Sequence, residues 1–400
     1  MKVLIAENGQ NVVESSRYMS KKGHKIFFAT PFADSIKKRI FFSKSYSKII
    51  NLKKTNSDSG KIKNLKKIYD KFSCDVFFPF GYNLVTEYIN QSFNNRELVM
   101  NSPYGCYSDY WNLSNKFNLY SLLKDTKILL PKFYGKISLG EKTNFNQGSF
   151  PIIVKRVAGV GIKNNVRIAW TNNQIQKIIK ELHNNKEKTD KFILQQYIPG
   201  YIFDVGGFSI DGIVYYNIPQ RRTITYPLRG GVAAVNDIYD DPKLLYLARL
   251  IINKTRWTGP FQTEFKYNPN DKKYYLLEVN AKMWGSLPLS LKANPDLLDI
   301  ALNVAVGKEV KKSLNFKKSL RYRWICEQEI RAIANGNIHD KIEFIRYFFY
   351  IKSFYDIDLN DIGPDLKRLF GSIATIAFKK YKLTKPLIDK KFYNSNKKIG

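Results

Sequence analysis

Short apolar runs alternate with amphipathic stretches over the first hundred residues. Lys2 to Ala6 is an apolar run with the length of a buried parallel strand, and Lys25 to Ala29 is a second. Between them, Val12 and Met19 lie on the apolar face of a predicted helix that ends near Gly23. The alternation continues with strands expected at Ile49 to Leu52 and Asp75 to Pro79, and helices expected at Lys61 to Phe72 and Val85 to Phe93.

Strands that alternate with helices predict an α/β arrangement, a small Rossmann-like parallel sheet that we assign to residues 1–111. The glycine-rich dinucleotide fingerprint is absent, because Glu7 to Gln10 holds a single glycine where that motif has three. This first domain is therefore not expected to bind NAD.

The pattern changes from about Asn112. Helices are expected from Leu113 to Thr126, with Lys116 in the first turn, and from Asn173 to His183. Strands are expected at Pro151 to Arg156, Val166 to Ala169, Phe192 to Ile198, Asp204 to Ile210, Ile213 to Tyr216, Gly259 to Tyr267 and Lys273 to Asn280. They predict an antiparallel α+β domain over residues 112–300, with subdomains of about 112–195 and 196–300. Residues 301–400 are predicted to be a mostly helical, basic region.

Composition narrows the class of protein. The chain has 400 residues, 44% of them hydrophobic, so it can bury a sizeable core and is not disordered. Its formal net charge of +32 favours an anionic partner: nucleic acid, an acidic lipid surface or a phosphorylated substrate. Heavy use of Lys, Asn and Ile explains the charge equally well as a composition bias without a partner.

Cysteines and histidines are few and scattered, which argues against a disulfide framework, a zinc site or a serine-protease-like triad. They are Cys74, Cys106, Cys326, His24, His183 and His339. No secretory signal is visible, and no stretch approaches the roughly eighteen uncharged apolar residues of a spanning helix. The expected compartment is the cytoplasm.

The strongest candidate site lies in the predicted hairpin between Gly259 and Asn280. Glu278 and Asn280 are two apart on one strand and so share a face, and the hairpin brings Glu264 beside them. Two carboxylates and an amide oxygen are hard ligands suited to Mg²⁺ held jointly with phosphate. The alternative is an ordinary hairpin with polar residues on its wet face.

Two weaker signals lie upstream. Lys155 ends a predicted buried strand, and the loop after it carries Gly159 and Gly161, so a lysine and free backbone N–H groups can meet phosphate oxygens. The loop is not a Walker A motif, and alone it fits a plain strand–turn–strand. The run from Leu194 to Gly200 is a strand leading into Pro-Gly, where backbone groups could face an adenine edge.

Taken in order, these segments resemble the ATP-grasp superfamily over roughly residues 1–300. Residues 278–286 read Glu-Val-Asn-Ala-Lys-Met-Trp-Gly-Ser, which looks like the Glu-x-Asn-x-Arg-x-Trp-Gly-Ser of the carboxylate-amine ligase and carbamoyl-phosphate-synthase-like branch. The resemblance implies two α+β subdomains that clamp ATP, preceded by a smaller Rossmann-like domain.

The resemblance also implies roles for single residues. Lys116 and Lys155 match the residues that hold the α- and β-phosphates, and Gly159 and Gly161 lie in the matching lid. Arg222 matches a basic residue near the γ-phosphate or acyl phosphate. The segment that reads adenine corresponds to Gln195, Gln196 and Ile198, and the metal ligands correspond to Glu264, Glu278 and Asn280.

Three positions depart from the family pattern. Gln195-Gln196 stands where Gln-Glu is usual, and the carboxylate expected for the ribose hydroxyls after Pro-Gly is missing, with Asp204 as its substitute. Lys282 replaces an arginine and cannot make that residue's bidentate fork to an acyl phosphate.

The implied reaction uses ATP and Mg²⁺ or Mn²⁺ to convert a carboxylate into an acyl phosphate, which an amine then attacks. Its partners are small-molecule carboxylate and amine substrates, with cell-envelope glycan or amino-acid conjugate synthesis as a candidate setting. A bicarbonate-using carboxylase or carbamoyl-phosphate type enzyme is one alternative. A non-catalytic basic nucleic-acid-binding protein is another, which the retained Glu264, Glu278 and Asn280 disfavour. A homodimer is expected only from the habit of the family.

The end of the chain carries a separate signal. Phe344 to Tyr355 is aromatic and basic, and Gly371 to Lys391 mixes apolar residues with lysine. Such a segment can lie on an acidic membrane surface, here the inner face, or can form a helical cap with a lysine-coated outer side.

Overall fold

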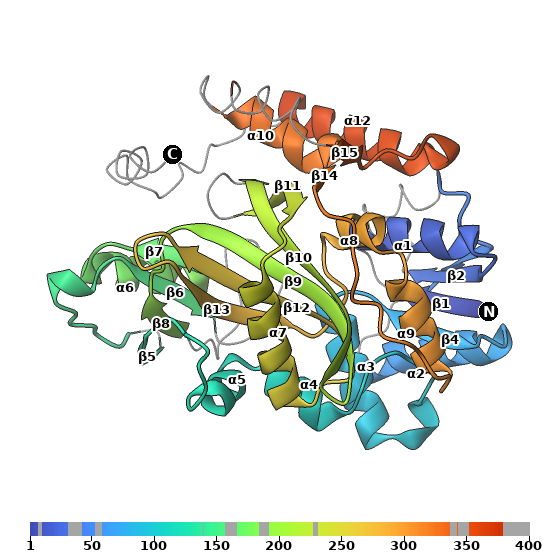
Figure 1. Ribbon diagram of the computed structural model, residues 1–400, viewed down its shortest axis with the longest axis horizontal. Helices are drawn as coiled ribbons and strands as arrows, with labels where there is room; N and C mark the ends of the chain where they lie inside the picture. The colour runs from blue at the N-terminus through green and yellow to red at the C-terminus, as the bar shows by residue number, and fades with distance from the viewer. Residues whose placement is uncertain are drawn as a thin grey trace.

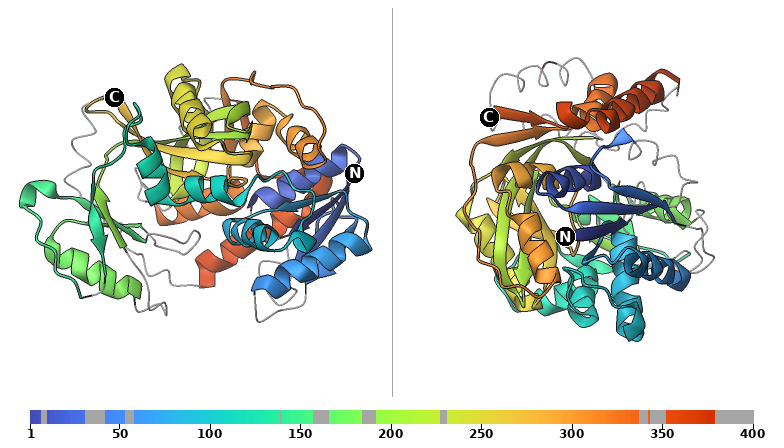
Figure 2. Two further views of the ribbon diagram at one scale, coloured as in Figure 1. Left: turned by 90° about the horizontal axis from the view of Figure 1, so that it is seen from below. Right: turned by 90° about the vertical axis from the view of Figure 1, so that its right-hand side faces the viewer.

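The computed structural model describes residues 1–6, 10–30, 42–52, 58–138, 140–156, 166–183, 192–226, 231–336, 342 and 352–378. These residues form three β-sheets with helices on their faces (Figure 1). The four-stranded sheet that contains β7 and the four-stranded sheet that contains β1 lie at opposite ends of the molecule, with the seven-stranded sheet between them (Figure 2).

The first sheet is parallel throughout, in the order β3-β2-β1-β4. Its strands are β1 (Lys2–Ala6), β2 (Lys25–Thr30), β3 (Lys48–Asn51) and β4 (Val76–Pro79), with helices α1 (Gln10–Lys21), α2 (Asp58–Lys71) and α3 (Tyr82–Asn94). The central strands are apolar on both faces because helices cover both, as in parallel sheets generally. The carboxyl end of β4 leads into Gly81, whose φ of 80° is a left-handed conformation that favours glycine.

The single helix expected from Leu113 to Thr126 is two helices, α4 (Tyr107–Ser114) and α5 (Lys116–Leu123). Asn115 between them adopts an extended conformation, and its side chain accepts hydrogen bonds from the backbone N–H of Phe117 and Asn118. An asparagine is a good N-cap because its carbonyl oxygen satisfies these otherwise unpaired donors. The break makes Lys116 the first residue of a helix.

The second sheet is antiparallel, in the order β5-β8-β6-β7. It consists of β5 (Phe133–Ile137), β6 (Ile152–Arg156), β7 (Val166–Ala169) and β8 (Phe192–Gln196), packed on helix α6 (Asn172–His183), with the short η4 (Gln147–Ser149) before β6. Its small core is separate from the others and includes Ile152, Val154, Ile175 and Ile179.

The third sheet has seven strands, in the order β13-β12-β9-β10-β11-β14-β15. They are β9 (Tyr201–Ile210), β10 (Ile213–Tyr226), β11 (Val232–Ile238), β12 (Gly259–Asn268), β13 (Lys273–Asn280), β14 (Leu320–Arg323) and β15 (Lys352–Tyr355). Helix α7 (Pro242–Thr255) covers one face, and the Trp284 segment with α8 (Leu287–Ala293) and α9 (Leu297–Ala305) packs toward the first sheet. The remaining elements are η3 (Arg96–Leu98), η5 (Ile325–Glu329), α10 (Ile330–Asn335), η6 (Leu359–Asp361) and α12 (Gly363–Phe378).

Two strands therefore occur in the region predicted to be mostly helical. β14 reads Leu-Arg-Tyr-Arg and is fully buried, and it pairs with β11 on one side and β15 on the other. The two arginines of β14 are typical of surface positions, so the sequence did not predict a buried strand. In the structure each arginine is paired with a carboxylate: Arg321 with Asp237 at 2.6 Å, and Arg323 with Glu329. No helix in the described part of the chain is long and apolar enough to cross a membrane.

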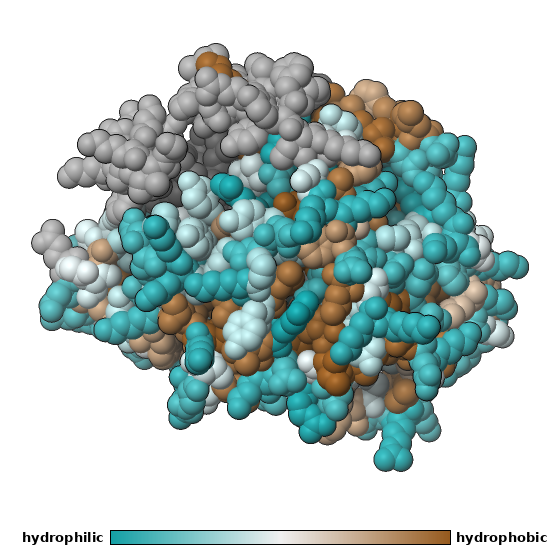
Figure 3. Space-filling view, in the orientation of Figure 1, coloured by the Kyte–Doolittle hydropathy of each residue, from teal (hydrophilic) through white to brown (hydrophobic). Residues whose placement is uncertain are grey.

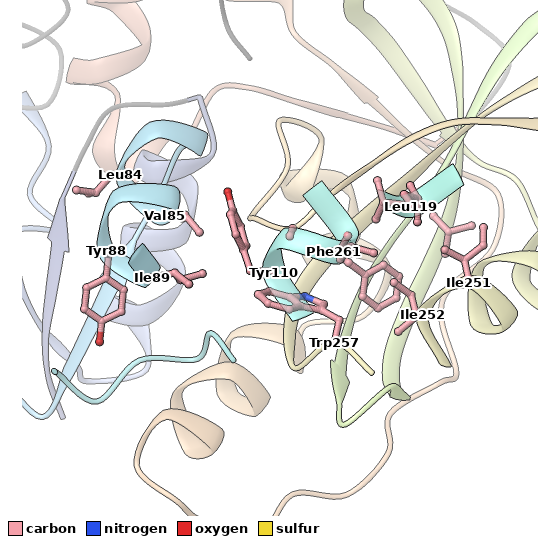
Figure 4. Packing of buried hydrophobic residues seen from close by; sticks show 14 of the residues in the cluster. Leu84, Val85, Tyr88, Ile89, Tyr110, Leu119, Ile251, Ile252, Trp257 and Phe261 are labelled. Atoms are coloured by element: carbon pink, nitrogen blue, oxygen red, sulfur yellow. The ribbon is translucent and has the colours of Figure 1, made fainter. Parts of the chain in front are cut away.

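Two large apolar clusters join the first sheet and its helices to the seven-stranded sheet. Figure 4 shows one of them, in which Tyr110 and Trp257 lie between side chains of α3 and side chains of α7; the labelled members include Val85, Ile89, Ile251, Ile252 and Phe261. A second cluster joins β1, β2 and β4 to α8, α9 and Trp284. The first sheet and the seven-stranded sheet thus share their cores.

Candidate active site

Three carboxylates form a row across neighbouring strands of the seven-stranded sheet. Asp204 on β9 is in register with Glu264 on β12, and Glu264 is in register with Glu278 on β13. Like charges directly opposite on a sheet repel, so such a row is stable only with cations or protons. The arrangement is expensive for the fold and therefore indicates a site that holds positive charge.

Arg222 on β10 supplies one of these cations. Its guanidinium donates from Nε and Nη2 to the two oxygens of Asp204, both at 2.9 Å, and Nη2 lies 2.8 Å from Oε2 of Glu264. This is the bidentate geometry that arginine makes with carboxylates. Asp204 is 1% exposed, and both of its carboxylate oxygens accept hydrogen bonds from Arg222.

Asn280 lies two residues beyond Glu278 on β13, and its side chain links Glu264 to Glu278. Its Nδ2 donates to Oε1 of Glu264 at 3.1 Å and to Oε1 of Glu278 at 3.4 Å. Asn280 therefore contacts both carboxylates that the sequence predicts as metal ligands. Among the described residues there is no group of three or more His, Cys, Asp or Glu that could hold a metal ion. The ligand set predicted from the sequence is instead two carboxylates and an amide. Such a set fits Mg²⁺ shared with phosphate oxygens, since Mg²⁺ usually takes only one or two carboxylates from the protein.

Lys116 reaches this row from the N-terminus of α5. Its Nζ lies 3.0 Å from Oε2 of Glu278. The ammonium of Lys116 is the main reason that the pKa of Glu278 falls to about 2, and Glu278 in turn raises the pKa of Lys116. Glu278 is therefore an ionised carboxylate at neutral pH, as a metal ligand must be.

Lys155 approaches from β6 of the second sheet and is 8% exposed. Burial and, to a smaller extent, the charge of Lys116 lower the pKa of its ammonium to about 7, against the opposing effect of Glu278. A phosphate bound beside Lys155 and Lys116 would favour the charged form of both lysines. The second sheet thus delivers a cation to the carboxylate row of the third.

Glu264 carries the opposite perturbation. Burial, with the charges of Asp204 and Glu278, raises the pKa of its carboxyl to about 7 against the effect of Arg222. Burial likewise raises the pKa of Asp204. A bound divalent cation would favour the ionised form of Glu264.

The predicted adenine segment lies on β8 and just beyond it. Gln195 is buried, and its amide nitrogen donates to the hydroxyl of Tyr120 at 2.8 Å. Gln196 accepts from the backbone N–H of Lys132 at 3.1 Å, and Ile198 is buried. Both glutamine side chains are thus engaged in hydrogen bonds within the protein.

Three further residues were predicted to belong to the site: Gly159, Gly161 and Lys282. Gly159 and Gly161 lie outside the described residues. Lys282 is half-buried in the segment after β13.

Sequence reasoning missed three residues around the site. Tyr82 lines a small pocket with Lys116, Glu278 and Asn280. Tyr120 holds Gln195, and its hydroxyl also donates to the backbone oxygen of Leu277 at 3.2 Å. Lys266, two residues after Glu264 on β12, has its pKa lowered to about 8 by burial and the charge of Arg222. Only Lys266 carried a sequence signal, since residues two apart on a strand share a face.

Comparison with known proteins adds a family. Residues 188–328 match a family model described as "ATP-grasp in the biosynthetic pathway with Ter operon". A search of curated protein sequences finds no match.

Solved structures with the same fold cover most of the chain. Biotin carboxylase from Campylobacter jejuni aligns with a TM-score of 0.62 and 16% identity, over 80% of this chain and 74% of that one. L-amino acid ligase from Bacillus licheniformis aligns with a TM-score of 0.61 and 15% identity, over 78% and 75%. The biotin carboxylase domain of Hydrogenobacter thermophilus 2-oxoglutarate carboxylase, in complex with MgADP, ADP and bicarbonate, aligns with a TM-score of 0.62 and 14% identity, over 80% and 73%. The family model matched over residues 188–328 and the shared fold together support a relationship to the ATP-grasp superfamily.

Proposed function

We propose that the protein is an ATP- and Mg²⁺-dependent ligase that activates a carboxylate as an acyl phosphate and joins it to an amine. The observation that carries the proposal is the mixed cluster of Lys116, Lys155, Glu264, Glu278 and Asn280, which come from the four elements α5, β6, β12 and β13. Two lysines suit phosphates, and two carboxylates with an amide suit a divalent cation shared with those phosphates.

The residues divide the work by charge. Lys116 and Lys155 hold the nucleotide phosphates. Phosphate oxygens would replace Glu278 as the partner of Lys116 and would stabilise the ammonium of Lys155, which burial disfavours. Glu264, Glu278 and Asn280 would hold Mg²⁺, which neutralises charge on the transferring phosphoryl group. Arg222, which hydrogen-bonds to Asp204 in the same row, faces the γ-phosphate in this proposal. Lys282 faces the acyl phosphate in this proposal.

We assign the parts of the chain accordingly. Residues 112–300 form the ATP-grasp unit, with the adenine read by the backbone of Gln195 to Ile198 between its two halves. Residues 1–111 contribute to substrate choice, because the pocket beside Glu278 is closed by Tyr82 at the start of α3. The matched family is described as acting in a biosynthetic pathway, which is consistent with a ligase.

A coupled phosphate-release screen tests the reaction. Purified protein with Mg-ATP is assayed against pairs of carboxylic acids, among them amino acids and sugar acids, and amines. We expect phosphate release that needs both partners, and hydroxylamine in place of the amine should trap the activated carboxylate as a hydroxamate. Glu278→Ala should abolish release, whereas Asp271→Ala, at the turn of the same hairpin and away from the row, should retain it.

One result separates the bicarbonate alternative. Phosphate release that requires bicarbonate and proceeds without any other carboxylate would contradict the proposed ligase and favour a carboxylase or carbamoyl-phosphate type enzyme.

A further inference from the structure

Helix α12 presents its apolar residues outward. Leu366, Phe370 and Ile373 recur at helical spacing and are 40%, 62% and 43% exposed. Ile362 just before the helix, and Leu359 in η6, continue this surface and are also exposed. Figure 3 shows hydrophobic residues over α12 at the upper edge of the view.

The side of α12 that faces the protein is polar instead. Asp365 and Arg368 are 2% and 9% exposed and form an ion pair with each other at 3.2 Å. Asp365 also accepts from Arg17 of α1 at 2.9 Å, and Arg368 lies 3.1 Å from Asp356. A surface helix normally buries its apolar side and exposes its polar one. α12 does the reverse, so its apolar face is expected to have a partner.

Charge selects among the partners. On the outward face, the described residues of α12 include one exposed charged side chain, Lys367. The sequence that follows the helix, residues 379–400, contains eight lysines and one aspartate. An apolar helical face joined to a lysine-rich segment matches the two signals of reversible membrane attachment, partial insertion and attraction to anionic headgroups. A second copy is disfavoured, because each chain carries a formal charge of +32.

We propose that the apolar face of α12, formed by Ile362, Leu366, Phe370 and Ile373, docks on an acidic phospholipid surface, to which the lysine-rich sequence that follows adds electrostatic attraction. The helix lies in the plane of the surface, and its ion pairs to α1 keep it attached to the enzyme. The inference is independent of the proposed ligase reaction, because none of these residues belongs to the carboxylate row or to its lysines.

Vesicle co-sedimentation of the full chain tests this proposal. Vesicles of phosphatidylcholine alone are compared with vesicles in which about three lipids in ten are phosphatidylglycerol, at about 0.1 M and 1 M salt. We expect binding only to the anionic vesicles, and weaker binding at high salt. Lys379→Gln with Lys380→Gln should weaken it by about fivefold per lysine, as expected for basic residues near an anionic surface.

Substitution of the apolar face provides the second arm. Phe370→Ser with Ile373→Ser should remove most vesicle binding while leaving the thermal unfolding and Mg-ATP binding of the protein unchanged. Tyr246→Ser with Ile213→Ser is the matched control, since both residues are exposed elsewhere, and it should bind vesicles as the wild type does.

Three outcomes would overturn the proposal. The wild type could fail to bind anionic vesicles, which would leave the face to be covered by the chain itself. It could bind both kinds of vesicle equally, which would remove the role of the lysines. It could form a dimer that Phe370→Ser with Ile373→Ser dissolves, in which case a second copy is the partner.

Discussion

Burial of Lys155 disfavours its charged form, and this lowers the stability of the folded protein when no anionic ligand is bound. Burial lowers the pKa of its ammonium from 10.5 to about 7, so the folded state is penalised for this lysine at any pH below 10.5. Above the unfolded pKa of 10.5, Lys155 is neutral in both states and does not reduce the free energy of unfolding. As the pH falls toward 7, the unfolded chain binds a proton that the folded protein does not, and the free energy of unfolding decreases. Phosphate binding would reverse the penalty.

We expect Lys155→Met to stabilise the protein without nucleotide and to abolish nucleotide binding. The gain should grow between pH 9 and pH 7 and reach about 1–4 kcal/mol at pH 7, from about 1.4 kcal/mol for each unit of pKa shift. Urea denaturation at both pH values measures it. The exposed Lys142→Met should change stability little at either pH. Equal or lower stability of Lys155→Met at pH 7 would contradict the account.

Glu264 predicts a pH dependence of metal binding. Its pKa of about 7 means that Mg²⁺ must displace a proton from it in acid solution. The factor by which Mg²⁺ tightens nucleotide binding should therefore shrink as the pH falls from 8 to 6, by up to about tenfold per unit. Comparing calorimetric titrations with and without Mg²⁺ at each pH cancels the separate titration of Lys155. In Glu264→Gln the factor should lose most of this dependence, and an unchanged dependence would show that another group releases the proton.

At the scale of single elements, the cap of α5 controls the site. Asn115 starts a new helix at Lys116, so the cap fixes where this lysine enters the carboxylate row. Asn115→Ala should cost about 1 kcal/mol of stability and weaken nucleotide binding as well. Asn95→Ala removes a comparable cap from η3, and its loss should leave nucleotide affinity intact. Thermal unfolding and nucleotide titration of the two variants separate the effects; equal nucleotide affinity in both would argue against the cap's role.

Strands and helices with strong periodicity were predictable from the sequence, and their joints were not. The strand Lys2–Ala6 and the hairpin strands β12 and β13 lie where the apolar pattern placed them. The break at Asn115 was missed because the helical pattern runs through it, and a cap is a local hydrogen bond that periodicity does not register. β14 was missed because its arginines read as surface residues until Asp237 and Glu329 come from elsewhere in the chain to neutralise them.

The site shows the same division. The spacing of Glu278 and Asn280 predicted a shared face, and in the structure the side chain of Asn280 contacts both Glu278 and Glu264. The fork from Arg222 to Asp204 depends on β9 and β10 being neighbours, which the sequence does not state. Tyr82 and Tyr120 come from helices packed by tertiary contacts, so no motif could have pointed to them.

At the scale of the whole molecule, Arg17 joins the first and last helices. Its guanidinium is 3% exposed and lies 2.9 Å from Asp361 and 2.9 Å from Asp365, with Glu14 at 2.6 Å. Arg17→Met would leave Asp361 and Glu14 without this cation and Asp365 with Arg368 as its ion-pair partner, and we expect a loss of about 3–5 kcal/mol. Lys21→Met on the same helix removes the exposed pair to Asp358 and should cost about 0–1 kcal/mol. Similar losses in the two variants would show that the buried network does not hold α12.

The proposed site residues come from parts of the fold that lie far apart in the sequence. Lys155 belongs to the second sheet, Lys116 to α5, and Glu264 with Glu278 to the third sheet, so the cluster exists only in the assembled protein. Binding of nucleotide with metal should therefore stabilise the whole chain rather than one part of it.

Calorimetric titration of Mg-ATP into the wild type and into Glu278→Ala with Asn280→Ala tests the central claim most directly. We expect saturable binding to the wild type that requires Mg²⁺, and a loss of at least about tenfold in affinity in the double variant, since both substituted residues are proposed metal ligands. A folded wild type that binds no nucleotide, or a double variant that binds as well as the wild type, would contradict the assignment of this carboxylate row as the site of ATP and metal.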